Sequence, residues 1–211
     1  MKSVKSYVMD DMWGHIIMSG PDIRGYILGE AHQTPQEQYK YCQGIFTVYP
    51  HMMLGNFTRW LWEGAPPKEY GAFMEVSVQG LQSKVLPALE ICFDGSKTEE
   101  ARGEVIVPLL TDVIPKYVLT GFYDYMFAGQ TDYKDIADFW PTVEPLLALT
   151  ARMLRLSYAG NMPTEERAEL FLFVGTRMPY LLLKRWYDWQ FGAEKMEMPP
   201  PPPEKLQKTE K

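Results

Sequence analysis

Histidine spacing is the first place to look for chemistry in this chain, because an imidazole binds metals and transfers protons near neutral pH. The sequence holds three histidines, His15, His32 and His51. Glu30 and His32 are two residues apart, whereas helical di-iron sites place Glu and His three residues apart on one face. Asp11 and His15 share a helix face, a spacing more typical of a local ion pair than of half a metal site. These spacings predict no metal site.

The nucleophiles and glycines do not form a catalytic pattern either. A serine or cysteine nucleophile needs a histidine and an orienting acid, and no Gly-x-Ser-x-Gly elbow is present. Cys42 falls inside an expected helix rather than at a helix N-terminus, which does not favour a reactive thiolate. Gly14, Gly20, Gly25 and Gly29 match neither nucleotide-binding fingerprint. We therefore predict no catalytic residue and no cofactor; enzymatic activity stays open but is the less expected alternative.

Composition and charge exclude several classes of protein. The 211 residues carry a formal net charge of -6, and 46% are hydrophobic. This length suits one domain with a sizeable core. The acidic balance argues against a general affinity for nucleic acid or anionic lipid, since such proteins usually carry a basic surface.

The compartment is inferred from cysteine use and from the first residues. The chain has only two cysteines, Cys42 and Cys92, which form no CxxC pair, and so few cysteines suit an intracellular, reducing compartment. Acidic residues interrupt residues 1–17, so we expect no secretory signal there. We also expect no membrane span. The apolar run from Leu170 to Leu183 contains Arg177, and we expect it to be able to lie against a membrane complex without crossing the bilayer.

Helix-start signals dominate the first half of the chain. Thr34–Glu37 offers a capping hydroxyl, a proline in the first turn and a glutamate that closes a capping box. The predicted helix runs to about Val48, and a second follows from Pro50 to Trp62. Ser96–Glu99 offers another capping box and opens a long apolar stretch.

Prolines are expected to break the later helices into short pieces. Pro108 and Pro115 should kink or split the apolar stretch, because each removes a backbone donor. Pro179 is expected to open a last helix. The helix from Pro141 to Tyr158 is predicted to be buried over most of its circumference. Its apolar residues are Leu146, Leu147, Leu149, Met153, Leu154 and Leu156.

Strand signals are weaker than helix signals. Met74, Val76 and Val78 alternate with polar residues, and residues 104–107 are rich in β-branched types. The sequence therefore predicts an all-α domain over residues 1–196, built from about eight to ten short, proline-kinked helices. An α+β fold with a small sheet is the alternative. Residues 197–211 are predicted to form an extended tail, because a proline run favours polyproline II.

Two features point to protein partners. Six Trp, thirteen Tyr and ten Phe are expected to form a large aromatic core or, in part, an interface, because aromatic residues are enriched in interfaces. The tail cannot fold alone and needs a surface to bind. The predicted partner-binding residues are Trp186, Trp189, Pro199, Pro200, Pro201, Pro202 and Pro203.

The favoured hypothesis is a non-catalytic structural or accessory subunit of a larger assembly, in a complex with other protein chains. The alternative is a helical enzyme or carrier with a buried apolar ligand pocket. A pocket holding a perturbed carboxylate or histidine would favour the alternative. A broad exposed apolar patch would favour the subunit.

Overall fold

The described part of the chain is helical. The computed structural model describes residues 34–61, 68–127, 132–160 and 162–192, and these contain helices and turns but no strand. The predicted all-α class is confirmed. The predicted tail, residues 197–211, lies outside the described residues. The longer helices, in chain order, are α2 (Pro35–Thr47), α3 (Tyr49–Leu61), α4 (Lys68–Phe93), α5 (Glu99–Pro108), α6 (Ile114–Phe127), α7 (Trp140–Ala159) and α8 (Thr164–Phe191).

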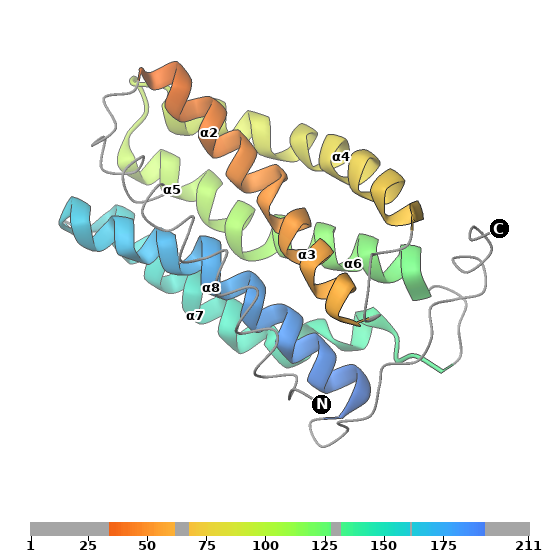
Figure 1. Cartoon of the computed structure of the whole chain (residues 1–211). Helices are drawn as coiled ribbons and strands as arrows, with labels where there is room; N and C mark the ends of the chain where they lie inside the picture. Colours follow the sequence, from red (N-terminus) through yellow and green to blue (C-terminus); the bar gives the residue numbers. More distant parts are fainter. Residues whose placement is uncertain (1–33, 62–67, 128–131, 161, 193–211) are drawn as a thin grey trace.

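The first helix begins where the sequence predicts. The Thr34 hydroxyl accepts from the Glu37 amide at 3.3 Å, and the Glu37 carboxylate accepts from the Thr34 amide at 2.8 Å. This reciprocal pair is a capping box, which satisfies two amides that have no partner inside the helix. Helix α3 follows α2 after Val48, and the two lie nearly in line (Figure 1).

The central helix is not split by its prolines. Helices α5 and α6 join through a π-helical turn, η1 (Leu109–Val113), so one helix runs from Glu99 to Phe127. The Ile114 amide donates to the Leu109 carbonyl five residues earlier. This wider turn lies between Pro108 and Pro115, the two residues that cannot donate. The prolines therefore change the hydrogen-bond pattern rather than end the helix.

Helix α4 occupies a region where no helix was predicted and where strand signals were noted. Its buried residues Leu81, Val85 and Leu89 recur every four residues, which is helical spacing. Val76, part of the apparent strand alternation, is 70% exposed on the outside of this helix. Residues 104–107 lie within α5. In the described residues the α+β alternative is therefore replaced by helix.

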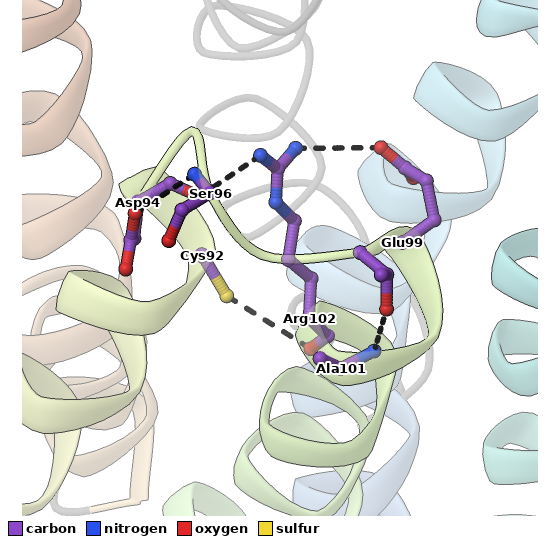
Figure 2. Close-up of polar contacts among 7 residues, drawn as sticks. Cys92, Asp94, Ser96, Glu99, Ala101 and Arg102 are labelled. Carbon is purple, nitrogen blue, oxygen red and sulfur yellow. Dashed lines mark hydrogen bonds and ion pairs between the residues drawn. The ribbon is translucent and has the colours of Figure 1, made fainter.

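Arg102 holds the turn between α4 and α5 (Figure 2). Its guanidinium donates to the Asp94 carbonyl at 3.1 Å and pairs with the Glu99 carboxylate at 3.3 Å. The helix cap is Thr98, whose hydroxyl accepts from the Ala101 amide at 3.2 Å. The capping box expected to start at Ser96 is therefore wrong: the cap begins at Thr98, and Glu99 pairs forward with Arg102.

Helix α7 matches the predicted helix from Pro141 to Tyr158 to within one residue at each end, whereas α8 is longer than its proline suggested. Asp135 caps a short 3-10 turn, η2 (Ile136–Asp138), just before α7. Helix α8 continues through Pro179 and ends at Gly192, whose positive φ of 82° suits glycine. Pro179 therefore lies inside one helix rather than at the start of another.

The helices stack in layers around the central one. Helix α4 packs on α2, α5 and α6, while α7 packs on α5 and α8, and α8 reaches α3. Figure 1 shows α5 and α6 between the α2–α4 layer and the α7–α8 layer. The core therefore lies on both sides of the helix from Glu99 to Phe127. That helix is long and apolar enough to cross a membrane by length and composition, and the bundle buries half of its most apolar window.

Candidate functional site

An apolar cavity of about 70 Å³ lies among three layers of helices. Its floor is formed by buried aliphatic side chains from α3, α6 and α8: Leu54, Leu119, Val174, Met178 and Leu182. Its mouth is formed by half-buried residues of α2, α3, α6 and α8: Ile45, Phe46, Pro50, Pro115 and Pro179. The sequence raised an apolar pocket as an alternative but could not identify these residues, because they come from distant segments.

Irregular helix geometry converges on the cavity. Pro50, Pro115 and Pro179 each come from a different layer, and all three line the mouth. The π turn contributes Leu110, and Ile114 follows directly after it. π turns inside helices are rare and recur at functional sites. The three proline rings are therefore part of the half-buried rim of the cavity.

None of the described residues that line the cavity has a titratable side chain. The perturbed histidine lies elsewhere: His51 is fully buried and its ring faces α4. Residues of α4 do not line the cavity. The combination that would favour an enzyme, a pocket holding a perturbed acid or histidine, is therefore not formed by the described residues.

His51 links α3 to α4 through a buried polar network. Its Nδ1 donates to the Thr47 carbonyl at 2.6 Å, which places the proton on that nitrogen. Its Nε2 then accepts from the Ser77 hydroxyl at 2.8 Å. Tyr70 donates to the His51 carbonyl at 2.9 Å. Burial lowers the pKa of His51 below its ordinary value, partly opposed by the bond to Thr47.

This network contains the serine–histidine pair of a nucleophilic site but lacks an orienting carboxylate and an accessible serine. The third partner is a backbone carbonyl rather than a carboxylate, and Ser77 is itself 6% exposed. A substrate carbonyl has no access to a hydroxyl buried between two helices. The arrangement is suited to joining helices α3 and α4.

A second apolar surface lies on the outside of α7. Leu149, Met153 and Leu156 are 56%, 41% and 58% exposed, and Leu146 before them is half-buried. We call these four residues the outer seam. The prediction that α7 is buried over most of its circumference is therefore wrong. The bundle covers only the neighbouring inner seam: Val143, Leu147, Thr150, Leu154 and Ser157.

Two arginines border the outer seam. Arg152 lies one turn from both Leu149 and Leu156, Arg155 lies farther round the same side of α7, and both arginines are exposed. Among the residues that the structure describes, neither arginine takes part in an ion pair. The seam is thus apolar, with free positive charge along one side.

The two predicted tryptophan anchors have different surroundings. Trp186 is 0% exposed, and its ring packs against Phe57, Phe122 and Phe127 at centroid distances of 5.8, 6.0 and 5.7 Å. Trp189 is half-buried and lies 5.5 Å from Phe139. Trp186 therefore fills the core of this chain, and Trp189 alone has surface to offer a partner. Pro199–Pro203 lie outside the described residues.

The cysteines are half-buried free thiols on α2 and α4. Burial raises the pKa of Cys42 to about 11 and that of Cys92 to about 11. Both stay protonated near neutral pH, so neither is a ready nucleophile. Within the described ranges, no group of three or more His, Cys, Asp or Glu side chains is placed to hold a metal ion.

Comparison with protein-family models, with curated proteins and with solved structures finds no match for this chain.

Proposed function

We propose that this protein is a non-catalytic accessory subunit of a larger hetero-assembly, and that it binds a helix of another protein chain along the outer seam of α7. One observation carries the proposal. Helix α7 displays three large apolar side chains in a row on a face that its own bundle leaves exposed. Contiguous exposed apolar surface in a folded protein marks an interaction site.

The spacing of the seam specifies the kind of partner. Leu146, Leu149, Met153 and Leu156 follow at intervals of three, four and three residues. This is the a/d pattern by which one helix receives the side chains of another. The partner is therefore a helix with its own apolar stripe.

The charged residues beside the seam indicate which side chains the partner helix carries. Arg152 and Arg155 lie on one side of the seam and lack ion-pair partners among the described residues. Acidic side chains beside the partner's apolar stripe would complement them, and such charges set pairing specificity between helices. We infer an acidic amphipathic helix as the ligand.

The tail and Trp189 form a second proposed contact. A proline run such as Pro199–Pro203 is pre-extended and docks into aromatic-lined grooves at low entropic cost. We place the assembly in an intracellular, reducing compartment, which the two free cysteines support. We propose contact with protein chains and not with nucleic acid, no membrane span, and peripheral attachment to a membrane complex.

Site-specific photo-crosslinking tests the seam. A benzophenone amino acid replaces Met153 in the full chain expressed in its native source, and Val76 on α4 serves as the matched exposed control. We expect position 153 alone to crosslink to one protein, through a peptide with apolar residues at three- and four-residue intervals and flanking Asp or Glu. Crosslinks only to a second copy, to residues 1–33 or to lipid contradict the proposal.

Charge reversal and truncation test the other two contacts on that same partner. R152E combined with R155E should weaken binding of the crosslinked peptide by about tenfold, because like charges then face each other. K40E, at an exposed site on α2, is the control and should bind normally. A chain ending at residue 196 should unfold at the same temperature yet retain less partner; unchanged retention removes the tail from the interface.

A further inference from the structure

We propose that the cavity between α3, α6 and α8 binds the end of an unbranched hydrocarbon chain. This inference is independent of the proposed contact on α7, because the lining residues and the outer seam do not overlap. The cavity is graded from a half-buried mouth to a floor where Leu54 and Met178 are each 1% exposed. An apolar group that enters gains burial progressively, which favours binding end-on.

The lining decides the chemistry of the ligand. The described lining residues are aliphatic side chains, prolines and one phenylalanine, and none of these carries a charged or titratable group. A carboxylate, phosphate or ammonium would lose its water without gaining a partner there, at high cost. The polar end of the ligand therefore stays outside the mouth, and only hydrocarbon enters.

The volume decides the shape of the ligand. The cavity measures about 70 Å³. An engineered apolar cavity of about 150 Å³ holds benzene, so a space half that size excludes compact rings. A thin, flexible chain needs less width than a ring to pass the half-buried residues of the mouth, Pro50, Pro115 and Pro179 among them.

Methyl NMR of the full chain with 1-decanol as probe tests the inference. Met178 is on the floor, whereas Met53 and Met126 are equally buried but do not line the cavity. With 13C-methyl methionine, we expect the Met178 signal alone to shift saturably. No Met178 shift, or equal shifts of all three methyl groups, overturns the proposal.

A chain-length series tests the shape argument. From 1-butanol upward, affinity should rise about fourfold per methylene group and then level off when the cavity is full. A steady rise without a plateau indicates adsorption to the surface and overturns the proposal. Benzene that moves Met178 as strongly as an alcohol of similar carbon number overturns the choice of a chain over a ring.

A blocked mouth gives the matched variant. Ile45→Trp puts a large ring at the mouth, while Val48→Trp puts the same ring on an exposed position of the same helical layer. We expect Ile45→Trp to weaken 1-decanol binding by about sixteenfold, the effect of losing two buried methylene contacts at about fourfold each. Val48→Trp should bind as the natural protein does. If both variants fold and bind 1-decanol with equal affinity, Ile45 is not at the mouth of the cavity. If Ile45→Trp does not fold, the shift of the Met178 methyl signal in the natural protein tests the proposal.

Discussion

Two tryptophans almost one helical turn apart on α8 show how much a residue's role depends on the face it occupies. Trp186 points into a cluster of Phe57, Phe122 and Phe127, and its indole nitrogen is buried without a hydrogen-bond partner. Trp189 packs at the rim, where the ammonium of Lys134 lies 5.4 Å from the centre of its ring. Both tryptophans belong to the same Arg-Trp-Tyr-Asp-Trp segment, so composition alone could not show that one is in the core and the other at the surface.

Alanine substitution should separate the two tryptophans by stability. Trp186→Ala should lower the free energy of unfolding by about 3–5 kcal/mol, because it removes a fully buried ring and leaves a cavity. Trp189→Ala should cost clearly less, since solvent already reaches its ring. Urea unfolding followed by circular dichroism measures both. Equal losses would mean that the rim contacts of Trp189 stabilise the fold as strongly as the ring cluster does.

Elements with local signals could be predicted, and elements that depend on packing could not. The start of α2 follows from Thr34 and Glu37, which satisfy each other's backbone without outside help. Helix α4 has no such cap pattern in the sequence before it, and Pro87 lies inside it. Pro108, Pro115 and Pro179 were each expected to interrupt a helix, but the helix continues past each of them. Each removes one hydrogen bond, and burial of the surrounding helix offsets that loss.

The candidate sites were less predictable than the helices. The outer seam was visible as leucines and methionine on one predicted helix, but its exposure depends on which face α5 and α8 cover. The cavity needs three layers to meet, so no local pattern could indicate it. Periodicity in one helix shows which residues share a face, whereas exposure requires the packed bundle.

Close contact between α5 and α7 makes a prediction at the element scale. A Cβ added at Gly103 would lie 2.9 Å from Cβ and Cγ of Tyr158. Gly103→Ala should therefore lower the free energy of unfolding by about 1–3 kcal/mol, since the two helices must separate. Gly44→Ala, where nothing lies within 4 Å, should instead stabilise α2 by about 0.5–1 kcal/mol. Urea unfolding of both variants provides the measurement, and two stabilised proteins would contradict the close packing of α5 on α7.

At the scale of the whole molecule, the fold separates three kinds of surface. The His51 network joins α3 to α4, the cavity opens between α3, α6 and α8, and the outer seam faces away from both on α7. A partner on the seam and a chain in the cavity contact different residues. The bundle can therefore hold both without either displacing the other.

The His51 network makes the stability of the whole bundle depend on pH. The pKa of His51 is lowered from 6.5 by burial, so the unfolded chain binds a proton more readily than the folded protein. Stability is therefore fully present above pH 6.5 and is lost as the pH falls from there toward the lower folded pKa. Protonated Nε2 also places a hydrogen against the Ser77 hydroxyl, which must then turn away.

Denaturant unfolding between about pH 7.5 and 5.5, the range in which histidine titrates, measures this slope. His51→Gln should be less stable at pH 7.5 yet lose less stability on acidification, because the buried titrating group is gone.

Two control variants should keep the pH dependence of stability. Ser77→Ala retains the imidazole and should keep the slope. The combined variant H15Q and H32Q should keep it too, since the slope is assigned to His51. The carboxylates with lowered pKa, Glu37 and Asp94, titrate below this range and do not contribute. If His51→Gln and the natural protein lose stability in parallel, another group sets the acid sensitivity and the neutral, buried imidazole is not what joins α3 to α4.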